Sequence, residues 1–321
     1  MTHKDTILYG DCRETLKTLT ISSVQTCVTS PPYYGLRDYG GEKNQIGLEQ
    51  TPEEYIDQLV QVFREVHRVL KDDGTLWVNI GDSYYNYRSG KGQALPKQTV
   101  SKSNQDLPQV NPKRGNKLDG LKEKDMIGIP WMLAFALRND GWYLRQDIIW
   151  HKPNPMPESV KDRCTKSHEY IFLLSKNKTY YYDNEAIKEP VKQDWGTRNR
   201  TKGKYHNSGT GLSVHTGLTK SYERKNKRDV WSVTNKPYKD AHFAVFPPDL
   251  IEPCILAGSK AGDIVLDPFM GSGTTAMVSK QHGRYYIGCE LHDKYADLIE
   301  KRVPAEKSSQ PIENPLTDLL Y

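Results

Sequence analysis

Apolar and β-branched residues at 24–28 (VQTCV) predict a buried strand near the start of the chain. The next six residues, Thr29–Tyr34 (TSPPYY), break this pattern, because two successive prolines cannot donate backbone hydrogen bonds to a neighbouring strand. The predicted strand therefore stops abruptly beside a hydroxyl, two carbonyl groups and two aromatic rings. Such a turn is either a cluster of hydrogen-bond acceptors next to an aromatic surface or a proline-rich strand exit packed by tyrosines.

A helix followed by a strand is predicted over residues 51–80. Thr51-Pro-Glu-Glu54 combines a capping box with a proline in the first turn. Apolar side chains then recur at helical spacing, at Tyr55, Leu59, Val62 and Val66. Lys71–Gly74 (KDDG) ends the predicted helix, and Thr75–Ile80 (TLWVNI) is the predicted strand. A helix that leads into a strand in this way is typical of an α/β fold.

Further helices and strands are separated by two polar inserts. The pattern predicts a helix over Met126–Leu137 and strands over Tyr143–Trp150, His168–Ser175, Ile264–Asp267 and Arg284–Glu290. Residues 88–125 have no aromatic residue and are rich in Lys, Gly, Gln, Asn and Pro. We expect this first insert to be a long mobile loop, because a loop of this length inside a domain is usually functional or disordered.

The second polar insert, residues 185–230, is basic and contains aromatic residues. Its charged and aromatic members include Arg198, Arg200, Lys202, Lys204, Arg224, Lys225, Lys227, Arg228, Trp195, Tyr205 and Tyr222. Basic side chains mixed with aromatic rings suit phosphate contact and base stacking in a nucleic acid. A run of charges is also typical of a solvated surface, and the insert alone leaves both interpretations open.

Composition and charge narrow the class of protein only slightly. The 321 residues are 36% hydrophobic, with a mean hydropathy of −0.74, a formal net charge of +5 and a pI of about 8.7, which permit a polyanionic partner without requiring one. The five cysteines are scattered and form no Cys-x-x-Cys pair, which argues against a disulfide framework and a structural zinc site. No apolar run has the length of a membrane span or signal peptide, so we expect a cytoplasmic protein with no membrane partner.

Residues 264–275 (IVLDPFMGSGTT) predict a strand, a tight turn and the start of a helix. Gly271 and Gly273 allow the backbone to approach a ligand closely. Ser272, Thr274 and Thr275 lie where the helix begins, and the free N–H groups of a helix start attract an anion.

Two acids follow from the same pattern. Asp267 ends the first strand, at the usual ligand edge of an open α/β sheet, and Glu290 ends the next strand at a spacing typical of a carboxylate that holds ribose hydroxyls. The third glycine of the dinucleotide-binding fingerprint is absent. Taken alone, residues 264–275 are therefore also compatible with an ordinary strand-to-helix turn.

Together, these motifs resemble those of the DNA amino-methyltransferases, which methylate exocyclic amines of cytosine or adenine. Residues 267–275 resemble the D-P-F-x-G-S-G-T-T cofactor loop of that family, and residues 30–33 resemble its catalytic [S/N/D]-P-P-[Y/F] tetrapeptide. Residues 9–12 (YGDC) resemble the segment whose acid, here Asp11, contacts the adenine ring of the cofactor. Residues 148–154 (IIWHKPN) and 242–248 (HFAVFPP) resemble further segments of the family.

The catalytic motif precedes the cofactor loop, an order that resembles the permuted beta class of the family. The resemblance implies one catalytic domain over residues 1–321 with an α/β fold. Its doubly wound, mostly parallel, Rossmann-like sheet would have one antiparallel strand near an edge. In that class the target-recognition region lies between the two halves, where residues 185–230 lie here. The resemblance does not extend to the two polar inserts, residues 88–125 and 185–230, or to the tail, 304–321.

The resemblance implies transfer of a methyl group from S-adenosyl-L-methionine to a base flipped out of the duplex. The lone pair of an exocyclic amine is delocalised into the ring, so acceptors around its hydrogens are needed to make the nitrogen more nucleophilic. The Ser30 hydroxyl and the Pro31 carbonyl are candidate acceptors, and the turn that Pro31 and Pro32 stiffen keeps them in place. The Tyr33 ring offers a stacking surface for the flipped base. Serine at the first position is associated mostly with cytosine, so we expect the 4-amino group of cytosine, with the 6-amino group of adenine as the alternative.

The candidate site residues fall into two groups, with no metal ligand among them. The catalytic candidates are Ser30, Pro31, Pro32 and Tyr33, and the cofactor-binding candidates are Asp11, Asp267, Phe269, Gly271, Ser272, Gly273, Thr274 and Glu290. Further candidates are Asn79, Asp82, Ser83 and Tyr84 for the base pocket or a turn cap, Trp150, His151 and Lys152 for a DNA-facing edge or for packing, and Asp38 for a supporting role.

The expected partners are double-stranded DNA and a cognate restriction endonuclease, in a bacterial or phage-infected cell, for a monomer or a homodimer. Three other classes remain open. A nicotinamide-dependent dehydrogenase shares the glycine turn but has no need of residues 29–34. A non-catalytic nucleic-acid-binding module would explain the inserts but not the cofactor loop. A methyltransferase that acts on RNA or on a protein amine shares motifs of this kind.

Overall fold

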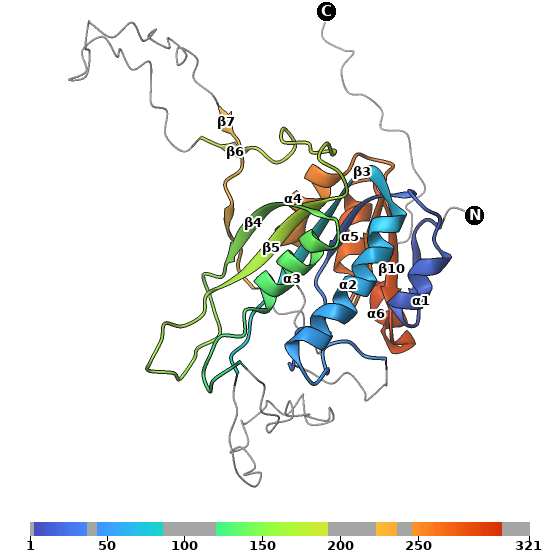
Figure 1. The fold of residues 1–321 in the computed structure, drawn as a ribbon. Helices are drawn as coiled ribbons and strands as arrows, with labels where there is room; N and C mark the ends of the chain where they lie inside the picture. The colour runs from blue at the N-terminus through green and yellow to red at the C-terminus, as the bar shows by residue number, and fades with distance from the viewer. Residues whose placement is uncertain (1–2, 37–43, 86–119, 192–222, 236–245, 304–321) are drawn as a thin grey trace, which may run out of the picture.

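The computed structural model describes residues 3–36, 44–85, 120–191, 223–235 and 246–303, and their elements form a sheet with helices on both faces (Figure 1). The helices are α1 (Cys12–Thr15), α2 (Pro52–Val69), α3 (Ile129–Asn139), α4 (Pro248–Gly258), α5 (Thr274–Gln281) and α6 (Ala296–Arg302), with short 3-10 turns η1 (Leu16–Thr18) and η4 (Asp293–Tyr295). The strands are β1 (Thr6–Tyr9), β2 (Val24–Thr29), β3 (Leu70–Ile80), β4 (Tyr143–His151), β5 (His168–Ser175), β6 (Glu189–Pro190), β7 (Arg224–Lys225), β8 (Val230–Ser232), β9 (Ile264–Asp267) and β10 (Tyr285–Glu290).

Within the described residues, the main sheet has eight strands in the order β1-β10-β9-β2-β3-β5-β4-β8. Strands β1, β10, β9, β2 and β3 are parallel, β5 is antiparallel to both β3 and β4, and β8 is parallel to β4. This arrangement confirms the predicted mostly parallel sheet with one antiparallel strand near an edge. Strands β9 and β10 come from the end of the chain but lie between β1 and β2, so the permuted order of motifs closes into one continuous sheet.

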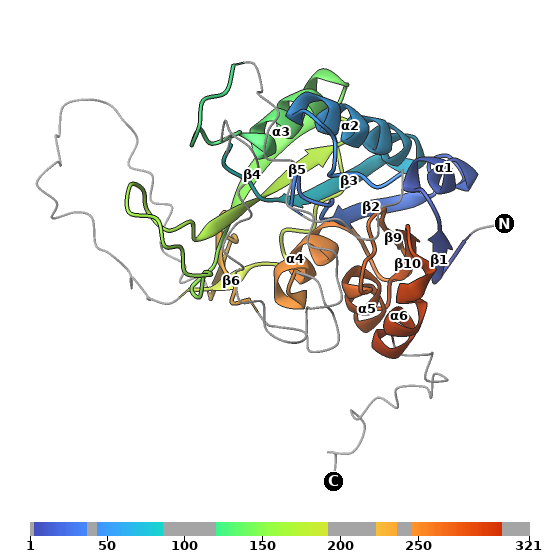
Figure 2. The ribbon, with the colours of Figure 1, turned by 90° about the horizontal axis from the view of Figure 1, so that it is seen from below.

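Two helical layers bury the faces of the sheet (Figure 2). Helices α1, α2 and α3 cover one face, and α4, α5 and α6 cover the other. The predicted apolar stripe of α2 is fully buried against the sheet, at Tyr55, Leu59, Val62 and Val66. The capping box is also confirmed, because the Thr51 hydroxyl accepts the Glu54 N–H at 3.1 Å and the Glu54 carboxylate accepts the Thr51 N–H at 3.3 Å.

The prediction was wrong about where β3 begins. Helix α2 ends at Val69, and β3 starts at Leu70 rather than at Thr75. Leu70 pairs with Val24, and the register then shifts before Thr75 pairs with Thr26. Gly74 lies in this irregularity, where a Cβ atom would come 2.9 Å from the Lys71 carbonyl oxygen. Lys71–Gly74 has the composition of a turn, but it lies within β3, between Leu70 and Thr75, which both pair with β2.

Helix α3 begins three residues later than predicted. Gly128 adopts a left-handed conformation with φ of 87° just before the helix, and the Asp82 carboxylate accepts N–H groups of Gly128 and Ile129, each at 3.0 Å. Met126 lies outside the helix and forms an isolated bridge with Tyr84. Asp82 therefore caps the start of a helix. Of the two roles that the sequence left open for it, the base pocket or a cap, the structure supports the cap. Strand β5 has the predicted bounds, and β4 is one residue longer than predicted.

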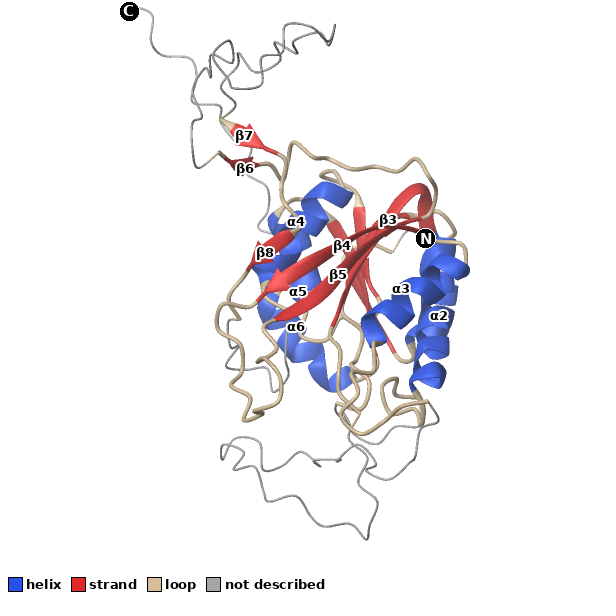
Figure 3. Ribbon diagram, turned by 60° about the vertical axis from the view of Figure 1, so that its left-hand side comes forward, coloured by secondary structure: helices blue, strands red, loops and turns tan. Residues whose placement is uncertain are grey.

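The described ends of the second insert come together in a small ladder that lies apart from the main sheet (Figure 3). Glu189 and Pro190 of β6 pair with Lys225 and Arg224 of β7, and the Arg228 guanidinium donates to the Glu189 carboxylate at 2.6 Å. Several predicted features lie outside the described residues: most of the first insert, residues 192–222 with Trp195 and Arg198, Asp38, and the tail. Within the described ranges no helix is long and apolar enough to cross a membrane.

Candidate active site

The carboxyl ends of β2 and β9 are neighbours in the sheet, so two motifs that are distant in sequence meet at one edge. Thr29 and Asp267, which end the two strands, are 238 positions apart in the chain. A pocket of about 670 Å³ lies at this edge, within the range of roughly 300–1,000 Å³ that small-molecule sites occupy. The predicted site residues that line it are Asp11, Ser30, Pro31, Pro32, Tyr33, Phe269, Gly271, Ser272, Thr274 and Glu290. Asp267 and Gly273 are not part of the lining.

Asp267 joins the two motifs from beneath the pocket. Its carboxylate accepts the Thr29 hydroxyl at 2.6 Å, the Thr275 hydroxyl at 2.7 Å and the Phe269 N–H at 3.0 Å. Burial raises the pKa of Asp267 to about 6, although these three hydrogen bonds act in the opposite direction. Because Thr29 ends β2 and Thr275 lies in α5, Asp267 holds the turn at Ser30–Tyr33 and the glycine turn together.

The glycine turn has the strained backbone that only glycine adopts easily. Gly271 and Gly273 have φ values of 55° and 81°, and a Cβ atom on Gly273 would lie 3.2 Å from a side-chain carbon of Ile299. The Gly271 N–H donates to the Glu290 carboxylate at 2.8 Å, and the His292 N–H donates to the same carboxylate at 3.1 Å. Burial raises the pKa of Glu290 to about 7, so this acid changes charge near neutral pH.

The Thr274 hydroxyl, at the start of α5, is buried against the pocket, and no described residue hydrogen-bonds with it. A buried polar group without a partner is costly unless a ligand satisfies it. The neighbouring Ser272 hydroxyl differs, because it accepts a hydrogen bond from the Arg302 guanidinium at 2.5 Å. An unpaired hydroxyl, a carboxylate and a positive-φ glycine turn together fit a polar ligand that carries both donors and acceptors.

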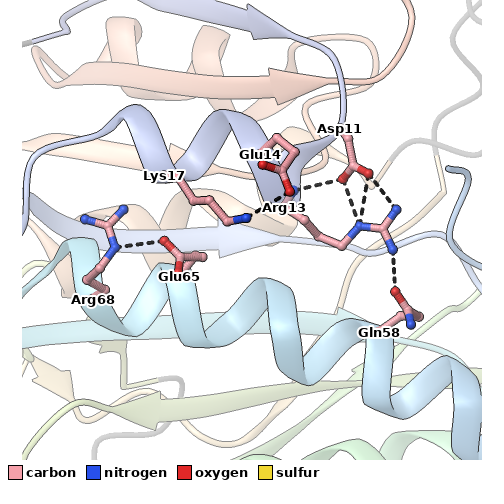
Figure 4. A network of polar contacts seen from close by, with 7 residues as sticks. All are labelled: Asp11, Arg13, Glu14, Lys17, Gln58, Glu65 and Arg68. Carbon is pink, nitrogen blue, oxygen red and sulfur yellow. Dashed lines mark hydrogen bonds and ion pairs between the residues drawn. The ribbon is translucent and has the colours of Figure 1, made fainter.

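Asp11 lies on the pocket wall but already has a strong partner (Figure 4). It caps the start of α1 through the Arg13 N–H at 2.9 Å, and its carboxylate also pairs with the Arg13 guanidinium at 2.6 Å. Arg13 in turn bonds Gln58 of α2. Partial burial would raise the pKa of Asp11, but the hydrogen bonds and charge of Arg13 outweigh it and the pKa is lowered. Asp11 thus caps the start of α1 and also lines the pocket.

The turn at Ser30–Tyr33, the predicted catalytic motif, presents its two proline carbonyls differently. The Pro32 carbonyl accepts the Tyr55 hydroxyl at 2.7 Å, whereas no described residue donates to the Pro31 carbonyl. The Tyr33 hydroxyl donates to the Glu169 carboxylate at 2.7 Å. Ser30, Pro31 and the Tyr33 ring therefore face the pocket with one carbonyl available, as expected for a site that accepts hydrogen bonds from a ligand amine.

Comparison with known proteins identifies the family of this chain. The DNA methylase family model matches residues 24–301, most of the sequence. The chain belongs to the DNA methylase family. This member of the family is 47% identical to the type II methyltransferase M.Cfr9I of Citrobacter freundii over 304 residues, which cover 95% of this chain and 89% of that protein. The resemblance to DNA amino-methyltransferases is thus confirmed.

Solved structures agree on the fold of this DNA methylase. The PvuII DNA methyltransferase, which is cytosine-N4-specific, matches with a TM-score of 0.62 and 18% identity, over 96% of this chain and 89% of that chain. A putative DNA modification methylase of Thermus thermophilus, solved in complex with S-adenosyl-L-methionine, matches with a TM-score of 0.57 and 24% identity, over 94% and 95% of the two chains. At these identities the likeness shows the shared methyltransferase fold.

The structure also brings into the pocket residues that sequence reasoning undervalued or missed. Asn79 and Lys152 were open candidates, and both line the pocket. Glu169 was not predicted at all, although it lines the pocket and bonds Tyr33. A charged residue in the otherwise apolar strand 168–175 (HEYIFLLS) was the available signal.

Other candidates from the same segments have structural roles. Trp150 is mostly buried, and its indole N–H donates to the Val233 carbonyl at 2.8 Å, although its ring reaches the pocket. His151 interacts with the Ser232 hydroxyl at 3.0 Å, in the neighbouring strand β8. The central carbon of the Arg163 guanidinium lies 3.9 Å from the centre of the Tyr84 ring. These contacts indicate that Tyr84 and His151 stabilise the packing of the structure. Trp150 has both roles, since it packs in the core and lines the pocket.

Proposed function

We propose that the protein transfers a methyl group from S-adenosyl-L-methionine to the 4-amino group of a cytosine flipped out of duplex DNA. The observation that carries this proposal is that one pocket holds both Ser30–Tyr33 and the glycine turn of the cofactor loop. Joining two reactants in one pocket converts a bimolecular reaction into a step within a complex, which supplies much of the rate.

The cofactor is S-adenosyl-L-methionine, in keeping with the family to which the chain belongs. When bound, it supplies an activated methyl group on a sulfonium centre. Glu290 would accept hydrogen bonds from the ribose hydroxyls, and the Thr274 hydroxyl and the turn at Gly271 would face the polar end of the molecule. Asp11, Phe269, Ser272 and Gly273 complete the proposed cofactor site, while Asp267 acts through the residues that it holds.

The catalytic turn would act on the amine of the base. The Ser30 hydroxyl and the Pro31 carbonyl would accept the amine hydrogens, which favours a tetrahedral nitrogen with an available lone pair. These acceptors need no reorganisation during the reaction, because Pro31 and Pro32 stiffen the backbone and Tyr55 holds the Pro32 carbonyl. The Tyr33 ring would stack on the base after it leaves the duplex.

The choice of cytosine rests on Ser30, the first residue of the tetrapeptide. In the family, serine at this position is associated mostly with cytosine, and aspartate or asparagine with adenine. One protein of the same fold is itself described as cytosine-N4-specific. At 18% identity that likeness shows the fold alone, so the serine carries the assignment.

The proposed substrate and setting are duplex DNA within a restriction–modification system, in the cytoplasm of a bacterium or phage-infected cell, with a cognate endonuclease as partner. The type II methyltransferase relative supports this setting. The second insert would contact DNA through its basic side chains. Two of its described basic residues already hydrogen-bond within the insert: Arg224 donates to the Lys188 carbonyl, and Arg228 donates to the Glu189 carboxylate. Residues 192–222 would therefore provide most of these DNA contacts. We also propose that the chain acts as a monomer or a homodimer.

The test is to incubate the purified protein with isotopically labelled S-adenosyl-L-methionine and genomic DNA from a bacterium without its own methyltransferases. The DNA is then digested to nucleosides, and the methylated nucleoside is identified by mass. We expect 4-methylcytosine. A Ser30→Ala, Tyr33→Ala double variant that still binds the cofactor serves as the matched control, and it should produce no labelled nucleoside.

Each alternative outcome overturns a different part of the proposal. 6-Methyladenine would overturn the choice of base but keep the reaction. Label in RNA or in protein but not in DNA would overturn the substrate. If the protein does not bind S-adenosyl-L-methionine, the reaction class itself is wrong.

A further inference from the structure

Glu169 is the centre of a hydrogen-bonded cluster on the pocket wall formed by β3, β4 and β5. Its carboxylate pairs with the Lys152 ammonium, accepts the Tyr33 hydroxyl at 2.7 Å and lies 3.4 Å from the Asn79 amide nitrogen. The Glu169 and Lys152 side chains are only 14% and 17% exposed. All four residues line the pocket, so the cluster lies at the site itself.

The cluster holds the Tyr33 ring at its outer end. The Tyr33 hydroxyl donates to Glu169 and lies 3.3 Å from the Asn79 side-chain oxygen. Burial, followed by the charge of Glu169, raises the pKa of Tyr33 well above its usual value, so the hydroxyl stays a donor at neutral pH.

The ring of Tyr33 is also confined along its edge. Gly81 lies beside it, and a Cβ atom on Gly81 would come 2.7 Å from a ring carbon of Tyr33. The hydrogen bond to Glu169 at the hydroxyl and the close contact with Gly81 at the ring edge therefore fix the orientation of the Tyr33 ring. A stacking surface held in this way is ready for a base before the base arrives.

A charged pair in this setting is not explained by stability. Removing two charges from water costs free energy that their attraction often fails to repay, so an apolar pair of similar size would serve a core equally well. The Lys152 ammonium also lies 4.2 Å from the centre of the Trp150 ring, which gives it a second fixed contact. Such a cluster is better explained by the orientation that it imposes on its members.

We propose that Glu169 is a positioning residue that fixes the plane of the Tyr33 ring and holds Lys152 at the wall of the target-base site. This inference rests on the proposed function, because it assigns Tyr33 to the base. Glu169 acts through Tyr33 and Lys152 and takes no part in binding the cofactor, whose loop follows β9. Loss of Glu169 should therefore slow methyl transfer without weakening cofactor binding.

The test is a double-mutant cycle with Tyr33→Phe, Glu169→Leu and the two combined, because leucine, unlike glutamine, has no oxygen to accept the Tyr33 hydroxyl. For each variant, kcat and KM are measured on the bacterial genomic DNA described above, and the Kd for S-adenosyl-L-methionine is measured by calorimetry. We expect Glu169→Leu to lower kcat by about tenfold to a hundredfold, as small displacements in active sites do, with the cofactor Kd unchanged within about twofold. The combined variant should be no more than about twofold slower than Glu169→Leu alone, because both changes remove the same contact.

Two further variants separate positioning from a general loss of structure. Lys152→Met removes the other charge and should lower kcat in the same way. Glu158→Gln is the matched control, because Glu158 pairs with Arg163 at 2.5 Å in the loop between β4 and β5 but does not line the pocket. This control should behave as the wild type.

The inference is overturned if the effects of Tyr33→Phe and Glu169→Leu multiply, if Glu169→Leu leaves kcat unchanged, or if it weakens cofactor binding as much as it slows the reaction. Failure of the proposed function looks different. In that case the wild-type protein itself methylates no DNA, and the inference falls with it.

Discussion

The two sides of the pocket are built in different ways. On the proposed cofactor side, the glycine turn and Glu290 meet across neighbouring parallel strands, and backbone N–H groups make the contacts. On the proposed base side, Tyr33, Asn79 and Glu169 come from three separate segments, and side chains make the contacts. One side is thus shaped by local backbone conformation and the other by side chains that the fold brings together.

This difference decides how each side responds to change. A backbone site depends on the few residues that permit its conformation, so it is sensitive to a Cβ atom where glycine is needed. A side-chain site depends on packing and on the pairing of buried polar groups, so it is sensitive to the loss of one partner. Asp267 lies between the two and bonds both motifs.

The largest effect is expected from Asp267→Ala, which removes the link between the two sides. The change removes the acceptor of the Thr29 hydroxyl, the Phe269 N–H and the Thr275 hydroxyl, the last of which keeps the Val28 carbonyl at 3.4 Å, and should lower the free energy of unfolding by about 2–4 kcal/mol. Urea denaturation followed by circular dichroism measures it.

The matched variant is Asp267→Asn, which keeps an acceptor oxygen and removes a buried charge. We expect it to lose about 1 kcal/mol or less, because both hydroxyls can rotate to suit the amide. Equal losses for the two variants would mean that the charge of Asp267, rather than its hydrogen bonds, holds the motifs together.

A pair of glycine substitutions should separate the two sides. Gly273→Ala places a Cβ at φ of 81° and 3.2 Å from Ile299, which should weaken cofactor binding by about tenfold or more through a displaced turn. Gly81→Ala has no backbone strain but pushes on the Tyr33 ring at 2.7 Å, so it should lower kcat about tenfold and spare the cofactor Kd. Calorimetry with S-adenosyl-L-methionine and a methylation assay measure the two effects. The distinction between the two sides of the pocket is wrong if Gly273→Ala lowers kcat and spares the cofactor Kd, or if Gly81→Ala weakens cofactor binding and spares kcat.

The same contrast explains what the sequence could predict. The strand and tight turn at residues 264–275 followed from residues close together in the chain, since the apolar residues 264–266 precede a glycine turn, whereas the parallel order of the strands was implied by the resemblance to the family. Glu169 lies 136 residues from Tyr33, and nothing local to either residue shows that they meet. The turn-like composition of Lys71–Gly74 misled the prediction for the same reason, because this irregular stretch belongs to β3 through its neighbours Leu70 and Thr75, which pair with β2.

The smallest of the three effects is a pH dependence on the cofactor side. Glu290 has its pKa raised to about 7 from an ordinary value of 4.5, so the native state binds this proton more tightly than the unfolded chain. Its contribution to stability therefore falls as pH rises from about 4.5 to about 7 and stays constant above that. In the proposed cofactor site the charged form of Glu290 would accept the ribose hydroxyls, so folding and cofactor binding would favour opposite protonation states of the same group.

Cofactor binding should consequently weaken as the carboxylate is protonated. If only the charged form of Glu290 binds, the Kd for S-adenosyl-L-methionine at pH 6 should be about tenfold higher than at pH 8, since the pKa lies one unit above the lower pH. Calorimetry across this range measures it, and Glu290→Gln, which cannot titrate, provides the reference for every other group, including those of the cofactor. The variant should bind weakly with a flatter pH profile. Parallel profiles for the two proteins would show that Glu290 does not contact the cofactor and that its raised pKa reflects burial behind the glycine turn alone.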